Sequence, residues 1–326
     1  MKGLKPVVII RYADKNVTSD FAPILTGVSF RDYLEGRASS IELQLSNAKG
    51  FFFGDWYPEV ADKISLRIGY EGLEMMDCGT FWVDEIKLTG GRGGDECTIS
   101  AMSIKPGALH GPKKRIHHPI GELKDFAGKV AAELELKVAG DMAGTWGGFQ
   151  KDETDIELCY RIAKETGCVL KVEGDTLVFT GLYAIQKQKE EPEKVLEIPR
   201  GNVLSYDVSN KAAGRITGCT VKWRDVKTKK EYSGSYDAGL PGGGSALIWE
   251  EVDSDSAAAQ KAKDYVTDRN KKGEEFSMSL MGDVRLRAGI CVRLKGFGRF
   301  DKSYYIAEAT HSISSSGYTT NITLRV

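Results

Sequence analysis

The stretch from Gly282 to Val326, GDVRLRAGICVRLKGFGRFDKSYYIAEATHSISSSGYTTNITLRV, has the clearest strand pattern in the chain. Its aromatic and β-branched residues fall into three runs, at 290–294, 304–309 and 318–324, with glycine- and serine-rich breaks between them. Such runs, separated by turn residues, are typical of antiparallel strands joined in a meander. The sequence therefore predicts that the chain ends inside a β-sheet, with its last strand held by its neighbours.

The composition bounds the class of protein. A chain of 326 residues is long enough for two or three domains, and its 41% apolar and 28% charged residues are ordinary for a globular protein. The net charge of -1 gives no electrostatic attraction to nucleic acid or to an anionic membrane. No apolar run suits a membrane helix, and Val7–Ile10 is too short for a signal peptide. Six cysteines without a CxxC pair indicate buried thiols in a reducing compartment, so we expect synthesis in a cytoplasm.

Upstream of this stretch, the pattern predicts an α+β fold that is mainly β. Residues 1–104 contain short strands, clearest where Ser40–Leu45 alternates with period two. Residues 105–185 predict a small α/β domain, whose second helix opens with the capping box of Thr154 and Glu157. A charged linker at 186–194 leads into a second strand-rich domain, 195–326, with a helix at 255–271 inserted into it.

The two strand-rich domains repeat one pattern. Gly36-Arg37 and Gly214-Arg215 are each followed by three apolar residues at the same offsets, which are Ile41, Leu43 and Leu45 in the first domain and Cys219, Val221 and Trp223 in the second. Two further segments recur in the same order: Phe81–Glu85 resembles Tyr304–Glu308, and Cys97, Ile99 and Ala101 match Thr320, Ile322 and Leu324. We interpret this as an internal duplication that gives two similar antiparallel β-barrels flanking the α/β domain.

The C-terminal stretch resembles the signature of the phage late control D family, the tail hub proteins of contractile tails. The matching positions are Ala288-Gly289, Gly296-Phe297-Gly298, Tyr304–Ile306, Glu308, His311 and Gly317-Tyr318-Thr319-Thr320, and the unit from Thr154 to Phe179 resembles the family's middle region. The resemblance implies a non-enzymatic homotrimer that joins a hexameric tail tube to a trimeric central spike. It also implies contacts with other baseplate proteins, leaves a contact with the tape-measure protein open, and implies a place in the virion tail after synthesis in the bacterial host cytoplasm. Compared with longer relatives the chain has no C-terminal extension, so a spike or lytic domain is expected on a separate chain.

A search for chemistry predicts no catalytic, cofactor-binding or metal-binding residue. Lys113–His118 is interpreted as a solvated basic loop, and two adjacent histidines make a poor metal pair. The alternative classes are a tail-tip cell-wall hydrolase, which needs paired carboxylates or a Cys/His nucleophile, and a glycan-binding module. Tryptophans that could stack on sugars stand at Trp56, Trp146 and Trp249. The aromatic loop Phe51–Pro58 is expected either to cover one end of a barrel or to bind a partner subunit.

Overall fold

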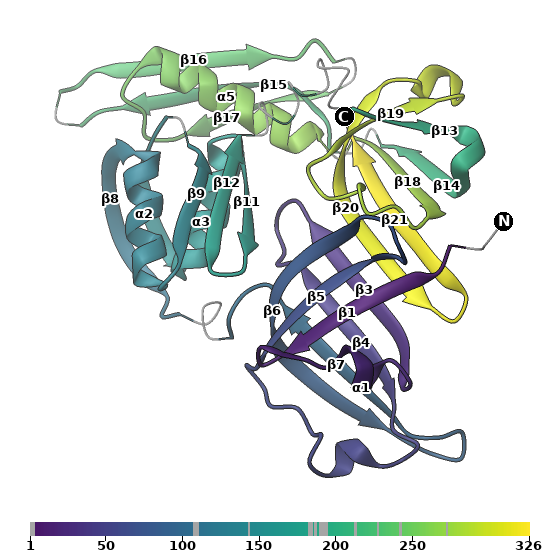
Figure 1. The fold of residues 1–326 in the computed structure, drawn as a ribbon. Coiled ribbons are helices and arrows are strands. Elements are labelled where there is room, and N and C mark those ends of the chain that lie inside the picture. The colour runs from purple at the N-terminus through teal and green to yellow at the C-terminus, as the bar shows by residue number, and fades with distance from the viewer. Residues whose placement is uncertain are drawn as a thin grey trace.

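The computed structural model describes residues 4–106, 111–142, 144–181, 185, 188, 195–211, 214–226, 228–240, 243–271 and 273–326. Strands dominate and helices are few (Figure 1), which confirms the mainly β class. Apart from residue 188, the expected linker at 186–194 lies outside the described residues, as does His110.

The first strand-rich part forms a module of six main strands, which we call the first module. Its strands are β1 (Pro6–Tyr12), β3 (Leu25–Tyr33), β4 (Ser40–Ser46), β5 (Lys63–Tyr70), β6 (Met75–Thr89) and β7 (Glu96–Met102), with β2 (Lys15–Asn16), α1 (Thr18–Phe21) and η1 (Phe51–Phe53) between them. They pair in the order β3–β4–β7–β6–β5–β1. The alternating Ile41, Leu43 and Leu45 point into its core and are almost fully buried, as the period-two pattern predicts.

The last part of the chain forms a second module with the same strand order. Its strands are β13 (Leu196–Pro199), β14 (Val203–Asn210), β18 (Glu274–Met281), β19 (Cys291–Lys295), β20 (Ser303–Ser314) and β21 (Gly317–Arg325), with η4 (Arg200–Asn202) and η5 (Gly298–Phe300). They pair in the order β14–β18–β21–β20–β19–β13, but β13 runs parallel to β19 whereas β1 is antiparallel to β5. The predicted meander at the C-terminus is therefore present as β19, β20 and β21.

The prediction of two closed barrels is wrong. In the described residues, no pairing joins β1 to β3 or β13 to β14, so neither module closes on itself. Instead β20 is shared: Cys291–Arg293 pairs with its beginning, and Gly27–Tyr33 of β3 pairs with its second half. The edge of β3 that would close the first barrel pairs with β20 instead. This pairing joins the two modules into one 13-stranded sheet.

The duplication itself is visible in the strand register. Every pair between β6 and β7 has a counterpart between β20 and β21 at a constant offset of 223 residues, and both ladders carry a bulge, after Val83 and after Ile306. Likewise the β3–β4 ladder has a bulge between Leu25 and Gly27, and β14–β18 has one between Val203 and Ser205, an offset of 178. The predicted equivalence of Phe81–Glu85 with Tyr304–Glu308 is thus confirmed.

The Gly-Arg equivalence, by contrast, is wrong. The strand that corresponds to β4 is β18, not the strand that follows Gly214-Arg215. That strand is β15 (Ile216–Arg224), which forms a separate sheet with β16 (Glu231–Asp237) and β17 (Gly244–Trp249). Helix α5 (Asp255–Asn270) packs on this sheet through Ala258, Ala262 and Val266. The insertion is therefore a three-stranded sheet plus a helix, placed between β14 and β18, and not a helix alone.

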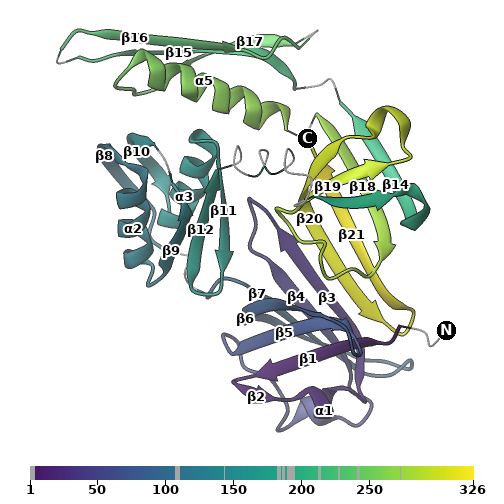
Figure 2. The same cartoon turned by 45° about the horizontal axis from the view of Figure 1, so that its top comes forward.

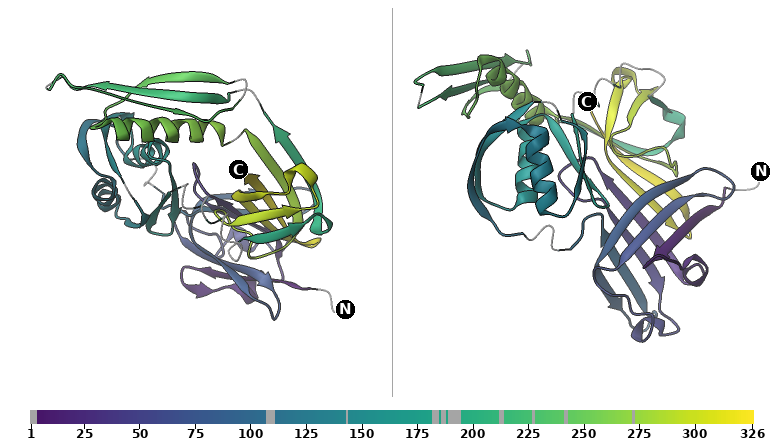
Figure 3. Two further views of the ribbon diagram at one scale, coloured as in Figure 1. Left: turned by 90° about the horizontal axis from the view of Figure 1, so that it is seen from above. Right: turned by 60° about the vertical axis from the view of Figure 1, so that its left-hand side comes forward.

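The middle part of the chain is an α/β unit. It comprises β8 (Lys114–Glu122), α2 (Leu123–Glu133), β9 (Lys137–Asp141), β10 (Thr145–Glu153), α3 (Asp155–Glu165), β11 (Cys168–Glu173) and β12 (Thr176–Gly181). The capping box of Thr154 and Glu157 is formed at the start of α3. Figure 2 shows α5 lying between the inserted sheet and this unit, and Figure 3 shows the same layering from two further sides. No helix in the described stretches is long and apolar enough to cross a bilayer.

Candidate functional site: domain junctions and exposed surfaces

Cys159, Cys168, His117 and His118 are the described cysteines and histidines of the middle third of the chain, from which a Cys/His nucleophile would have to be built. Cys159 is buried in the α/β core, and this burial raises the pKa of its thiol to about 12. His117 Nε2 lies 3.4 Å from a carboxylate oxygen of Glu251, and His118 Nε2 lies 3.2 Å from Gln150 Oε1. Among the described residues, no three His, Cys, Asp or Glu side chains are arranged to hold a metal ion.

The basic stretch Lys113–His118 is not a loop, because Lys114 onward forms β8. Lys114 Nζ pairs with Glu133 at 2.6 Å and with Asp155 at 2.7 Å, and Arg115 binds both carboxylate oxygens of Asp152 at 2.6 Å. These three carboxylates neutralise the stretch, which therefore offers no basic face to a polyanion. The sequence did not predict this strand because most of its residues are charged or polar. The alternation of apolar and polar positions that indicates a strand is therefore weak here.

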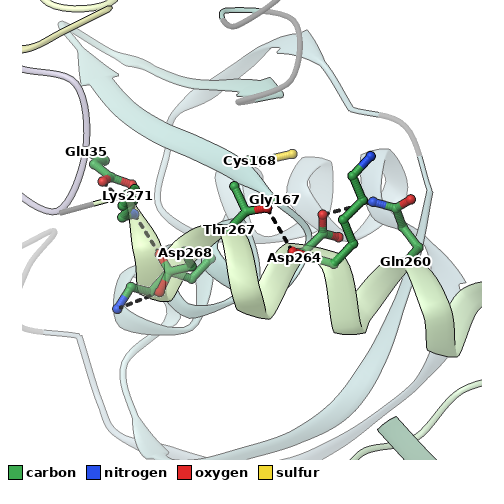
Figure 4. Close-up of a pocket in the computed structure, with 10 residues that line it drawn as sticks. Glu35, Gly167, Cys168, Gln260, Asp264, Thr267, Asp268 and Lys271 are labelled. Atoms are coloured by element: carbon green, nitrogen blue, oxygen red, sulfur yellow. Dashed lines mark hydrogen bonds and ion pairs between the residues drawn. The ribbon is translucent and has the colours of Figure 1, made fainter. Parts of the chain in front are cut away.

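A pocket opens where α5 meets α3, β11 and the β3–β4 connection (Figure 4). Lys271 Nζ, with its side chain 7% exposed, lies 2.6 Å from Glu35 Oε1 and 2.6 Å from Asp268 Oδ1. Lys164 of α3 reaches Asp268 at 3.8 Å. The ammonium group of Lys271 thus links the first module, through Glu35, to the insertion. Asp268 of the insertion is in turn linked to the α/β unit through Lys164.

The other end of this pocket holds Asp264. Burial raises the pKa of its carboxyl group to about 6, and Gln260 Nε2 donates a hydrogen bond to Oδ1 at 2.9 Å. Gly167, at φ +65°, lies against it, and a Cβ there would come within 2.7 Å of Asp264 Oδ1. The other carboxylates that line the pocket, Glu35 and Asp268, are paired with Lys271 at its opposite end. The pocket is a packed junction between parts of the chain.

Asp32 forms the second junction. It is fully buried and accepts hydrogen bonds from Ser39 Oγ at 3.1 Å and from the backbone N–H of Ala288 at 3.1 Å. Lys171 Nζ, from β11 of the α/β unit, lies 2.7 Å from Oδ1. Both modules and the middle unit therefore meet on one carboxylate. In the sequence, Asp32 occupies the next inward-facing position after Val28 and Phe30. An acidic residue is rarely buried at such a position, and this could have identified Asp32 as a junction residue.

His311 lies next to this junction on β20, where it stacks on Phe30 with ring centroids 6.0 Å apart. Its Nε2 is 2.9 Å from the carbonyl oxygen of Leu286, which can only accept, so Nε2 carries the proton. Its Nδ1 then accepts from the Tyr318 hydroxyl at 2.8 Å. Burial lowers the pKa of His311 to about 4, so the ring is neutral at pH 7. It forms hydrogen bonds within the second module and stacks on Phe30 of the first.

The aromatic loop has a buried side and an exposed side, and its expected contact with a partner subunit stays a prediction. Phe52 is fully buried in the first module's core, so the loop does cover one end of it. Phe53 is 66% exposed and Tyr57 51% exposed, which leaves an apolar surface at that end. Trp56 stacks on Phe51 with centroids 4.7 Å apart.

The two other tryptophans differ from each other. Trp146 is buried and its Nε1 donates to Glu165, so it cannot serve as a sugar platform. Trp249, on β17, is 65% exposed.

Comparison with known proteins gives a consistent result. A family model described as YQBQ-like matches residues 248–325. The chain is 24% identical to the probable baseplate hub proteins of Escherichia phage 186 and Escherichia phage P2, over 99% of this chain and 94% of each relative.

Solved structures extend the similarity to the fold of the whole chain. The tail protein from Neisseria meningitidis MC58 superposes with a TM-score of 0.73 at 15% identity, covering 99% of this chain and 97% of that protein. A chain of the Francisella PdpA–VgrG complex superposes with a TM-score of 0.54 at 9% identity, covering 99% of this chain and 58% of that one. The chain is therefore similar, over nearly its whole length, to two probable phage baseplate hub proteins and to a tail protein of the same fold.

Proposed function

We propose that this chain is a baseplate hub protein of a contractile phage tail or of a related phage-tail-like injection particle. Its similarity to two probable baseplate hub proteins extends over 99% of its length. The fold similarity to a tail protein supports the same assignment. In this role the protein resides in the tail or baseplate of the particle.

The observation that carries the proposal is the repeated strand module. Two modules with one strand order and matching bulges lie in a single chain. A homotrimer then presents six similar modules, which can meet a sixfold tail tube on one face. The α/β unit and the inserted sheet occur once per chain, so they reduce the sixfold ring to threefold symmetry and suit a trimeric spike.

The junctions fit a mechanical part. Asp32 and Lys271 each fix more than one part of the chain through short, buried ion pairs. Such contacts hold domains in one relative position, and losing one partner of a buried pair is costly. The role requires a rigid connector and no turnover. Its partners are further copies of itself, the tail tube protein, the central spike protein, other baseplate proteins and the tape measure.

The test is the mass and shape of the purified chain, alone and mixed with the tail tube and spike proteins of its own particle. We expect threefold rings that bind the tube protein on one face and the spike on the other. A monomer that binds neither protein and cleaves peptidoglycan would instead establish the hydrolase alternative. A monomer that binds oligosaccharide but neither partner would establish the glycan-binding alternative.

A further inference from the structure

A strand pairing joins the two modules, and its register can be used to predict a second pairing of the same kind. The second half of β20 pairs with β3 in a ladder that runs from Glu308 opposite Tyr33 to Ser314 opposite Gly27. Its inward-facing pairs include His311 with Phe30 and Ala309 with Asp32. This ladder places the second module directly beside the first.

Each strand of this ladder has a counterpart in the other module. Residues 85–91 are the counterpart of 308–314, because the β6–β7 and β20–β21 ladders match at an offset of 223. Residues 205–211 are the counterpart of 27–33, because the β3–β4 and β14–β18 ladders match at an offset of 178. The chain therefore contains each side of the ladder twice but, in its described residues, forms the ladder once.

In the part of the chain that the structure describes, both unused sides are free edges. Residues 85–89 of β6 pair with β7 on one side, and β5 covers only Met75–Trp82 on the other. Among the described strands, β14 pairs with β18 alone. The run β6–β7–β4–β3–β20–β21–β18–β14 is thus eight strands wide, with an unpaired strand edge at each end.

An open edge of this kind is a template for pairing with another chain. On β14 the edge also carries exposed apolar side chains, since Leu204 is 60% exposed and Tyr206 46% exposed.

Resting on the hub function above, we propose that residues 85–91 of one copy pair antiparallel with residues 205–211 of the next copy, in the register of the β20–β3 ladder. The facing pairs are then Glu85 with Lys211, Ile86 with Asn210, Lys87 with Ser209, Leu88 with Val208 and Thr89 with Asp207. Because the two edges differ, the contact is head-to-tail and repeats around a ring.

The side chains brought together by this register are complementary. Glu85 faces Lys211, and Lys87 lies diagonally across from Asp207, with all four side chains exposed in the single chain. Leu88 and Val208, each partly buried against its own module's core, would become neighbours and continue the apolar layer across the contact. Opposite charges and apolar pairs directly across an antiparallel ladder are the combinations that stabilise it.

The backbone is also in phase. The N–H of Lys211 bonds to the carbonyl oxygen of Gly273, on the β18 side, so those of Asn210 and Val208 point to the free edge. In the β20–β3 ladder, the N–H of Leu34 bonds to Ala307, and hence Asp32 and Phe30, the counterparts of Asn210 and Val208, face the shared edge in the same way. Glu85 and Lys211 therefore form a non-hydrogen-bonded pair, the kind with the closest side chains.

Disulfide cross-linking of the full chain tests this register. All six native cysteines are buried, so a mild oxidant acts on introduced pairs. The variant E85C/K211C should give a ladder of covalent species that stops at three chains, because directly opposite residues lie within disulfide reach. The control E85C/S209C is shifted by two residues, to a separation of roughly 7–8 Å, and should stay uncross-linked. The single variants E85C and K211C should give no dimers, since neither position meets its own copy.

Charge exchange gives a second readout that does not depend on oxidation. E85K and K211E should each raise the midpoint concentration of assembly about tenfold, and the double variant E85K/K211E should restore it. The matched control K222E changes an exposed lysine on β15, away from both edges, and should leave assembly unchanged.

The cross-linking is run on the chain alone and with the tail tube protein added. Absence of the E85C/K211C ladder under both conditions, or equal cross-linking of the shifted control, overturns the proposed register. Trimers of the correct mass that lack this cross-link would leave the hub function standing while removing the interface. A monomer that ignores the tube protein would remove both.

Discussion

Replacing Asp32 by alanine removes the carboxylate on which both modules and the α/β unit converge. Asp32 is fully buried, and the side chain of its partner Lys171 is only 14% exposed. The variant leaves the Ala288 N–H and Ser39 Oγ without their acceptor, and it leaves Lys171 with Glu173, 2.8 Å away, as its remaining partner.

The size of the effect follows from these contacts. Removing one partner of a buried ion pair costs about 3–5 kcal/mol. Because Glu173 still compensates Lys171, we expect the lower end, about 3 kcal/mol, which at about 2.1 cal/mol/K per residue corresponds to a melting temperature lower by about 4–5 °C for a chain of 326 residues. The double variant D32A/K171M removes both charges and should recover at least half of the loss.

Calorimetry of D32A, D32A/K171M and the unmodified chain measures these shifts, with D175A as the control. Asp175 pairs with Lys137 at 2.8 Å, but both side chains are more than half exposed, so the control should cost less than about 1 kcal/mol. A D32A variant that melts within about 2 °C of the D175A control, where only a surface effect is expected, would refute the view that Asp32 holds the three parts together.

Three further predictions concern single positions. Burial lowers the pKa of His311 to about 4 from an ordinary value of 6.5, so its contribution to stability is present above pH 6.5 and is lost as the pH falls toward 4. Melting curves across that range should show a loss of up to about 3 kcal/mol that is smaller in H311Q, and an identical slope in both would contradict it. At the capping box of α3, T154A should cost about 1 kcal/mol in urea unfolding, and no change would mean that the cap is dispensable. G167A should cost about 2 kcal/mol and the control G174A, with a similar positive φ but no atom near its Cβ, about 1 kcal/mol; equal values would show that Gly167 does not pack closely against Asp264.

Local pattern was sufficient to predict much of the fold. The alternation of Ile41, Leu43 and Leu45, the cap at Thr154 and the C-terminal meander all depend on interactions within or between adjacent segments. The equivalence of Phe81–Glu85 with Tyr304–Glu308 could be read as well, because a bulge fixes the same spacing in both copies.

Contacts between distant segments could not be predicted in this way. The pairing of β20 with β3 joins residues that are almost the whole chain apart, and nothing local in Gly27–Tyr33 shows which strand will cover its edge. For the same reason, the sequence predicted two closed barrels, whereas in the structure β20 pairs with β3 across the two modules. The inserted sheet was missed because β15 has the same alternation as the module strand β18, so the pattern alone assigned it to the wrong sheet.

If the hub proposal is right, the two strand modules of each chain give a trimer six modules around one ring. Native mass spectrometry combined with cryo-electron microscopy of the chain mixed with the tail tube protein of its proposed particle tests this. We expect a mass of three times the 35.8-kDa chain and a threefold ring in which six modules alternate around one circle against the tube. A twofold dimer, or a ring in which only one module of each chain faces the tube, would contradict it.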